Sequence, residues 1–188
     1  MKLCVFFNGT NCVGKTSLAK SLANLYGGGN SQITKHLTLC RNNKIAFAGH
    51  YREGSRYGGV DGFNSTKCLA EVVEQALAVS DVVVCEGSYF HTIGLNLTNA
   101  MFKADKHLVV YLYAPVEVLN ARLIARGGKP ITPIMVSKQK QCLVAARKWA
   151  SMGVPVLSFD TSKNSPEEIA EAVGRKIDEL CGRNTTTK

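Results

Sequence analysis

Short runs of apolar residues alternate along the chain with segments in which apolar residues recur every three or four positions. Such runs are typical of strands buried in a parallel sheet, and the recurrent spacing is typical of amphipathic helices. The pattern predicts strands at 2–8, 33–40, 44–50, 81–85, 107–113 and 154–159, and helices at 14–26, from about 65, at 93–104, 115–125, 134–151 and 166–181. This alternation predicts an α/β fold, a five-stranded, mostly parallel sheet with helices on both faces and ligands at the carboxyl ends of its strands. With 188 residues and 45% hydrophobic content, residues 1–183 are expected to form a single domain, followed by a frayed tail at 184–188.

A glycine-bounded segment lies between the first predicted strand and the first predicted helix. It reads Gly9-Thr10-Asn11-Cys12-Val13-Gly14-Lys15-Thr16, continues into Ser17, and matches G-x-x-x-x-G-K-[ST] at every fixed position. The glycines let backbone N–H groups face phosphate oxygens, and the helix N-terminus adds a positive partial charge. Lys15 is expected to reach the β- and γ-phosphates, and Thr16 to give its hydroxyl to Mg²⁺. The segment therefore predicts a P-loop NTPase with residues 9–17 as its nucleotide-binding loop.

A P-loop alone is compatible with a kinase, a motor or switch ATPase, and a GTPase. The chain holds no N-K-x-D string, which a GTPase would use to select its base, and the strand 81–85 does not end in adjacent acids, as a motor ATPase would require. It is followed instead by Glu86-Gly87, a single carboxylate with room for a substrate beside it. We expect Glu86 to accept the proton of an attacking hydroxyl or to hold an Mg²⁺-bound water. Asp61, in the glycine-rich segment 54–64, is the alternative base or a substrate anchor, and the kinase interpretation is favoured.

Basic residues are unevenly distributed along the chain, whose formal net charge is +9. Residues 120–150 hold no acidic residue and seven basic ones, namely Arg122, Arg126, Lys129, Lys138, Lys140, Arg147 and Lys148. Arg122 and Arg126 share a helix face next to a Gly-Gly break, and phosphoryl transfer needs mobile cations that cover the phosphate oxygens and then withdraw. We therefore predict an arginine-bearing lid at about 122–140. The excess also favours a polyanionic partner, either a nucleotide or a nucleic acid.

The segment Val109-Val110-Tyr111-Leu112-Tyr113-Ala114-Pro115-Val116-Glu117, followed by Arg122 and Arg126-Gly127, resembles the strand and lid of thymidylate kinases and deoxynucleoside kinases. With the P-loop and the strand before Glu86, the resemblance covers residues 1–160. It implies the nucleoside and nucleotide kinase fold, ATP with Mg²⁺, Arg122 near the adenine and Arg126 on the phosphates. It also implies that the loop 160–163, which begins with Asp160, lies by the adenine.

The chain departs from both families around the acceptor. It carries Glu86-Gly87-Ser88 where deoxynucleoside kinases carry Glu-Arg-Ser, and it lacks the Asp-Arg-aromatic string of thymidylate kinases. The region 49–62 instead resembles small P-loop kinases of tailed bacteriophages, among them the 5-hydroxymethyluracil DNA kinases, which phosphorylate a modified pyrimidine already in DNA. The basic excess favours this acceptor, because a duplex gains affinity from every phosphate that is neutralised. The residues expected at the acceptor are Arg52, Arg56, Tyr57, Asp61 and Glu86.

Two other functions are compatible with the sequence. One is a soluble deoxynucleoside or nucleoside-monophosphate kinase in which Arg52 and Arg56 bind the acceptor, and the other is a nucleotide-dependent DNA-binding protein without kinase activity. No run approaches the roughly 18 to 20 uncharged apolar residues of a membrane span. We expect a cytoplasmic protein, in the host cytoplasm if its source is viral, with ATP and DNA that contains a modified pyrimidine as partners and no membrane partner.

Overall fold

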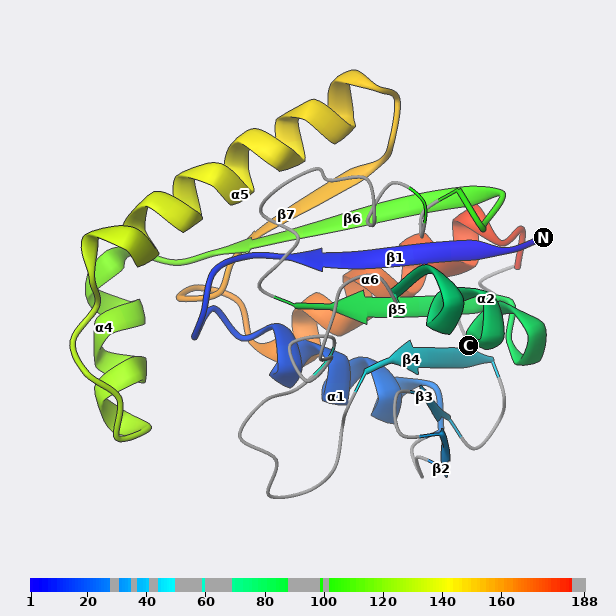
Figure 1. Ribbon diagram of the computed structural model, residues 1–188, viewed down its shortest axis with the longest axis horizontal. Helices are drawn as coiled ribbons and strands as arrows, with labels where there is room; N and C mark the ends of the chain where they lie inside the picture. The colour runs from blue at the N-terminus through cyan, green and yellow to red at the C-terminus, as the bar shows by residue number, and fades with distance from the viewer. Residues whose placement is uncertain are drawn as a thin grey trace.

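The computed structural model describes residues 1–27, 31–34, 37–40, 44–49, 59, 69–87, 99 and 102–183, with the backbone alone for 31–34 (Figure 1). Its strands are β1 (Leu3–Asn8), β2 (Ser31–Thr34), β3 (Leu37–Leu39), β4 (Ile45–Ala48), β5 (Val82–Glu86), β6 (Lys106–Tyr113) and β7 (Val156–Asp160). Its helices are α1 (Lys15–Leu25), α2 (Leu69–Val79), α4 (Val116–Ala125), α5 (Pro133–Ser151) and α6 (Pro166–Leu180). The helix predicted at 93–104 and the tail at 184–188 fall largely or wholly outside the described residues.

The strands form one sheet in the order β2-β3-β4-β5-β1-β6-β7. From β4 to β7 the neighbouring strands run parallel, whereas β2 pairs with β3, and β3 with β4, in antiparallel fashion. The predicted count of five strands is therefore wrong, because the described residues alone form seven. The run 33–40 was expected to be one strand, but it divides between β2 and β3. Residues 35 and 36 are Lys and His, which lack the turn chemistry of Gly, Pro, Asn or Asp that would have indicated the division.

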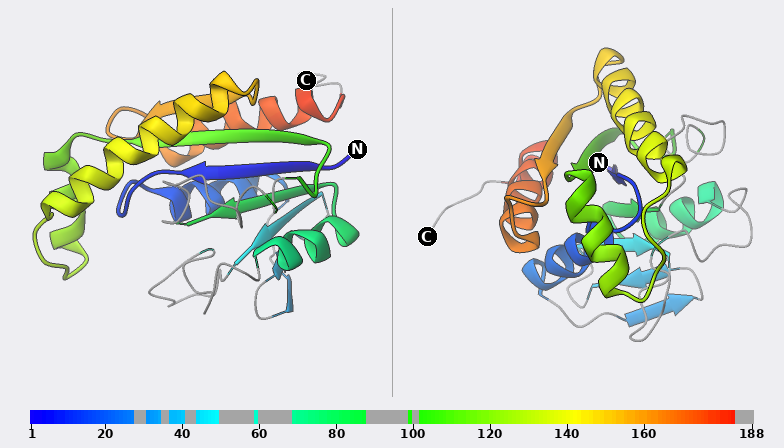
Figure 2. Two further views of the ribbon diagram at one scale, coloured as in Figure 1. Left: turned by 45° about the horizontal axis from the view of Figure 1, so that its top comes forward. Right: turned by 90° about the vertical axis from the view of Figure 1, so that its left-hand side faces the viewer.

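Helices cover both faces of the sheet, as the sequence predicts. On one face the side chains of Leu3, Val5 and Phe7 pack in a core cluster with α1 and α6. On the other face Cys4 and Phe6 belong to a cluster that includes α2 and, through Trp149, α5. Figure 2 shows the two layers, with α4 near one end of the sheet. Because β1 alternates between two apolar cores, it is buried along its whole length and holds the following loop at a fixed place.

The described helices include none that is both long and apolar enough to cross a bilayer.

Candidate active site

The turn between β1 and α1 has the backbone conformation of an anion-binding loop. Gly14, at the N-cap of α1, has a φ of 99°, and a Cβ added there would meet open space, so its backbone conformation is what requires glycine. Gly9 is required for a different reason, because a Cβ there would lie 2.7 Å from the Leu112 carbonyl oxygen. Cys12 adopts a φ of 61° without being glycine. Alternation of right- and left-handed residues turns successive N–H groups toward one point, which suits phosphate oxygens.

Lys15 is buried at the start of α1, with 7% of its surface exposed. Its Nζ donates to the carbonyl oxygens of Gly9 and Thr10, both at 2.9 Å. In the described part of the chain no carboxylate forms an ion pair with it. Burial of an uncompensated ammonium costs several kcal/mol, so an anion bound at this loop would stabilise the arrangement.

A cavity of about 230 Å³ opens beside the loop. It is lined by Cys12, Val13, Gly14, Ser17, Leu18, Leu112, Arg122, Arg126, Thr161, Asn164, Pro166 and Ile169. The P-loop residues and the two arginines in this set were predicted at the nucleotide site, and the structure brings them together from segments more than a hundred residues apart. Five other P-loop residues predicted at the nucleotide site do not line the cavity, namely Gly9, Thr10 and Asn11 in the turn and Lys15 and Thr16 at the start of α1.

Arg122 connects helix α4 to the loop after β7. Its guanidinium donates to the Thr161 hydroxyl at 2.9 Å and to the Thr161 carbonyl at 2.6 Å. Arg126, at the C-cap of α4, lines the same cavity. The loop 160–163 thus reaches the cavity through Thr161 and not through Asp160. The amide and hydroxyl of Ser162 both donate to Asp160, and these hydrogen bonds hold the pKa of that carboxyl below its ordinary value.

Glu86 is the last residue of β5 and is 1% exposed. It pairs in register with Phe7 of β1, two positions before Gly9, so the predicted base and the P-loop lie at the same edge of the sheet. One glycine, Gly59, packs against Glu86, and a second, Gly49, packs against Gly59. A Cβ on Gly59 would overlap the backbone and the Cγ of Glu86, and a Cβ on Gly49 would overlap the backbone of Gly59. Of the glycine-rich segment the structure describes Gly59, which lies against Glu86.

Hydrogen bonds hold helix α5 against the carboxyl ends of β1 and β6. The Asn8 side-chain amide donates to the Cys142 carbonyl at 2.8 Å, and the Thr10 hydroxyl donates to the Met135 carbonyl at 3.4 Å. The Gln139 side-chain amide donates to the Ala114 carbonyl at 3.0 Å. The first half of α5 is thus hydrogen-bonded to the P-loop through Thr10 and to the ends of β1 and β6 through Asn8 and Ala114.

The other predicted acceptor residues, Arg52, Arg56, Tyr57 and Asp61, lie outside the described residues, and their roles stay predictions. Sequence reasoning did not include five residues that line the cavity, namely Leu18, Leu112, Asn164, Pro166 and Ile169. Leu18 and Ile169 are buried residues on the inner faces of α1 and α6. Nothing in the sequence separates them from ordinary core positions. Asn164 and Pro166 do have a signal, since they follow the loop that the kinase resemblance places by the adenine.

Mg²⁺ suits the donor set that the sequence predicts here. It prefers oxygen ligands and keeps several waters, so the Thr16 hydroxyl and a single carboxylate meet its needs together with phosphate oxygens. In the part of the chain that the structure describes, no group of three or more His, Cys, Asp or Glu is placed to hold a metal. The arrangement therefore fits a metal that arrives with a nucleotide better than one held in a cage of protein side chains.

No protein-family model and no curated protein matches the sequence. Solved structures do match it along nearly the whole chain. The YorR protein of Bacillus subtilis, solved with phosphorylated GDP, is 19% identical with a TM-score of 0.55, over 96% of this chain and 99% of that one. A sugar kinase from a Janibacter species, without ligand, is 17% identical with a TM-score of 0.57, over 98% and 99%. A deoxyadenosine kinase from M. mycoides, solved with dCTP, is 13% identical with a TM-score of 0.51, over 95% and 100%. The chain thus has the fold of the P-loop kinases.

Proposed function

We propose that this protein is an ATP-dependent kinase that transfers the γ-phosphoryl group to a hydroxyl of a pyrimidine-type acceptor. The observation that carries the proposal is Lys15, a buried ammonium held by two backbone carbonyls beside a cavity lined by Arg122 and Arg126. Two arginines that line the cavity and a buried lysine in the adjoining loop, at the start of a helix, form a site for a polyphosphate. The P-loop kinase fold supports the same activity.

The residues divide the chemistry between them. Glu86 takes the proton of the acceptor hydroxyl as its oxygen attacks the γ-phosphorus, and the bond from that phosphorus to the β-phosphate bridging oxygen breaks. Lys15, with Arg126, stabilises the negative charge on the transferred group and the leaving diphosphate. Thr16 would hold Mg²⁺, which supplies further charge neutralisation when bound. Arg122, oriented by Thr161, lines the part of the site that would hold the adenine of ATP.

The acceptor that we propose is 5-hydroxymethyluracil in DNA. The resemblance of residues 49–62 to the phage kinases supports it, and so does the absence of any acid in residues 120–150. A base within a duplex would have to turn out of the stack to reach Glu86. In this proposal Arg52, Arg56 and Tyr57 bind the extruded nucleotide, and Asp61 is the alternative base.

An acceptor panel with γ-labelled ATP and Mg²⁺ tests this proposal. The panel holds a duplex with 5-hydroxymethyluracil, the same duplex unmodified, free deoxynucleosides and nucleoside monophosphates, and Lys15→Ala is the inactive control. Label in the modified duplex alone is the expected result. Label in a free nucleoside or monophosphate would show that the proposed DNA acceptor is wrong, and it would favour a soluble deoxynucleoside or nucleoside-monophosphate kinase. If no acceptor is labelled although ATP and DNA both bind, the kinase proposal fails, and a nucleotide-dependent DNA-binding protein is favoured.

A further inference from the structure

Helix α5 has one face in the core and one face in solvent. Cys142, Ala145, Ala146 and Trp149 form its buried side. Its outward stripe runs through the exposed residues Ile134, Ser137, Lys140, Gln141, Val144, Arg147, Lys148 and Ser151. The helix is 19 residues long and contains no Asp or Glu. Every charge on its outward stripe is therefore positive.

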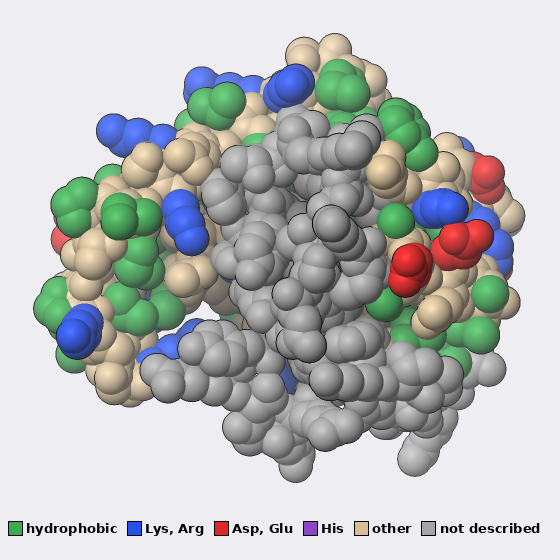
Figure 3. All heavy atoms as spheres, in the orientation of Figure 1, with side chains coloured by type: hydrophobic (Ala, Val, Ile, Leu, Met, Phe, Trp, Pro, Cys, Tyr) green, Lys and Arg blue, Asp and Glu red, His purple; other side chains and the backbone are tan. Residues whose placement is uncertain are grey.

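The cations on this stripe, Lys140, Arg147 and Lys148, carry no ion pair with any carboxylate of the described residues. Elsewhere on the surface such pairs are present, as between Arg175 and Glu171 on α6. Helix stability does not account for the composition of α5, because acidic residues in its first turn and at i, i+4 from each cation would stabilise it. Figure 3 shows Lys and Arg side chains along the edge of the molecule that α5 occupies.

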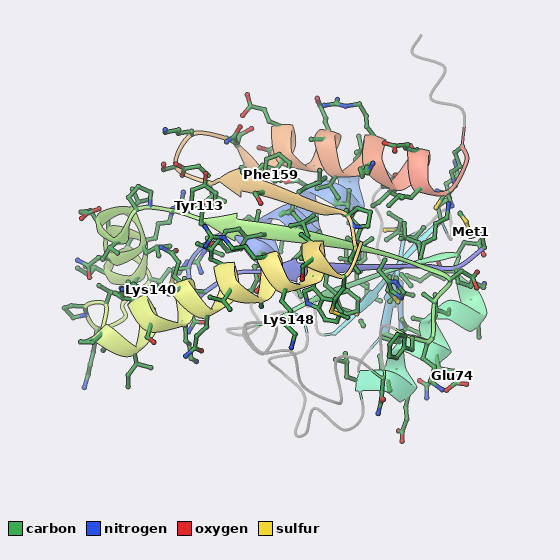
Figure 4. All side chains as sticks on the ribbon, turned by 90° about the horizontal axis from the view of Figure 1, so that it is seen from above. Met1, Glu74, Tyr113, Lys140, Lys148 and Phe159 are labelled. Carbon is green, nitrogen blue, oxygen red and sulfur yellow. The ribbon has the colours of Figure 1, made fainter. Side chains whose placement is uncertain are left out.

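The spacing of these cations fits a double helix better than a small anion. Lys140 and Arg147 are seven residues apart, which is about 10.5 Å along a helix axis, and Lys140 and Lys148 are about 12 Å apart. The major groove of B-DNA is about 12 Å wide, so cations at this spacing can reach phosphates on both of its sides. Figure 4 labels Lys140 and Lys148 at separate places along the helix. A free nucleotide does not span that distance with its phosphates.

The position of α5 relates this stripe to the candidate active site. The hydrogen bonds from Asn8 and Thr10 tie the backbone of α5 to the P-loop turn. Lys138 differs from the outward cations, because it is half-buried and, together with Lys15, counteracts the rise in the pKa of the buried Cys142 thiol. The helix thus presents one cation toward the P-loop side and three cations to solvent.

We infer that the outward face of α5 is a docking surface for double-stranded DNA, with Lys140, Arg147 and Lys148 on its phosphates. The inference rests on the proposed function in one respect, since a duplex docked here lies beside the site of phosphoryl transfer. Such contacts position the duplex without reading its sequence, so unmodified DNA binds there as well.

The test is a binding measurement without ATP, on an unmodified duplex of about two helical turns, at salt concentrations from ~50 to ~200 mM. The variant is Lys140→Gln, Arg147→Gln and Lys148→Gln together, since Gln keeps helix propensity and removes only the charge. The control is Lys20→Gln, Arg175→Gln and Lys176→Gln together, which removes the same net charge from α1 and α6 on the opposite face. Helix content by circular dichroism confirms that both variants fold.

Each neutralised phosphate contributes about 0.9 to the slope of log K against log salt, so the α5 variant should have a slope shallower by about 2 to 3. We expect its affinity at ~100 mM salt to fall at least tenfold, and the control to stay within about threefold of the parent. Equal losses in the two variants, or an unchanged slope in the α5 variant, would overturn the inference.

Transfer of label to the 5-hydroxymethyluracil duplex at saturating duplex concentration separates this result from the fate of the kinase proposal. If both proposals hold, the α5 variant needs more duplex than the parent to reach its maximal rate, but that maximal rate equals the parent's. Duplex binding through α5 without transfer to any acceptor would leave the docking surface in place and remove the kinase. Transfer to a free nucleoside or monophosphate by a parent protein that does not bind a duplex would remove the docking surface and leave a kinase with another acceptor.

Discussion

The thiol of Cys12 allows occupancy of the nucleotide site to be tested by chemical labelling. It is half-buried, lines the cavity and lies inside the P-loop with a left-handed backbone conformation. The other thiols near the sheet are buried. Burial raises the pKa of Cys4 to about 12 and the pKa values of Cys40 and Cys142 to about 11. Thiolates are the reactive form, so these three remain protonated and unreactive at neutral pH.

We expect an alkylating reagent at pH 8 to modify Cys12 well before Cys4, Cys40 or Cys142. Peptide mass spectrometry measures the rate for each residue. ATP with Mg²⁺ at saturating concentration should slow the reaction of Cys12 at least tenfold, because the phosphates cover the loop. Labelling of Cys12 that is equally fast with and without the nucleotide would place the nucleotide elsewhere.

The same buried thiols make the stability of the fold decrease at alkaline pH. A thiol whose pKa is higher in the folded protein than in the unfolded chain stabilises the fold fully below the unfolded pKa of about 8.5. That stabilisation decreases as the pH rises through the folded values, about 11 for Cys40 and Cys142.

Residues of the P-loop were predictable because local chemistry requires them. Gly14 is required by its own φ, and Lys15 by the phosphates it is expected to meet. Ile169 and Leu18 reach the cavity only because α6 and α1 pack together on one face of the sheet, and no local pattern contains that information. Arg52, Arg56, Tyr57 and Asp61 were predicted as acceptor residues, and of positions 52–61 the structure describes only Gly59.

At the scale of elements, two glycines fill the space between the ends of strands β4 and β5. Gly49 follows β4, and Gly59 lies between it and Glu86 at the end of β5. A side chain at position 59 has no room unless Glu86 moves. Gly59 is thus a positioning residue for the proposed base, and Gly153 after α5 is a matched control. Gly153 has a similar φ of 81°, but a Cβ added there meets nothing within 4 Å.

We expect Gly153→Ala to lose about 1 to 2 kcal/mol of stability from the left-handed backbone, and Gly59→Ala to lose more, because its Cβ also overlaps the buried backbone of Glu86. Only Gly59→Ala should also displace Glu86 and slow phosphoryl transfer, by at least tenfold, with the affinity for ATP unchanged. Denaturant unfolding and transfer rates measure the two effects separately. Equal transfer rates in the two variants would show that the contact does not position the carboxylate.

Most elements were predictable from the spacing of apolar residues. The helices at 115–125, 134–151 and 166–181 and the strands that begin and end near β1, β5 and β6 are confirmed, because long periodic segments bury one consistent face. The β2–β3 hairpin was missed, since the run 33–40 is apolar enough to read as one strand. The two residues between these strands, Lys35 and His36, carry no turn signal that would have divided the run.

At the scale of the whole molecule, the strand order assembles the site. With β1 between β5 and β6, and β7 beside β6, the P-loop, Glu86 and Thr161 all follow the carboxyl ends of neighbouring strands. Segments near residues 10, 86, 120 and 160 therefore meet at one edge of the sheet, where parallel α/β folds bind their ligands. The α5 cations extend this edge outward, away from the α1 and α6 layer.

The most direct test of the central claim is the rate of a single phosphoryl transfer by Glu86→Gln, on the best acceptor of the panel. Glutamine keeps the size of the side chain and removes the base, so transfer should slow by about 10² to 10⁴-fold. The dissociation constant for ATP, measured in parallel, should change less than about threefold, because the P-loop is intact. Asp61→Asn, measured beside it, should retain transfer. Transfer by Glu86→Gln within tenfold of the parent rate, together with loss of transfer in Asp61→Asn, would contradict the account.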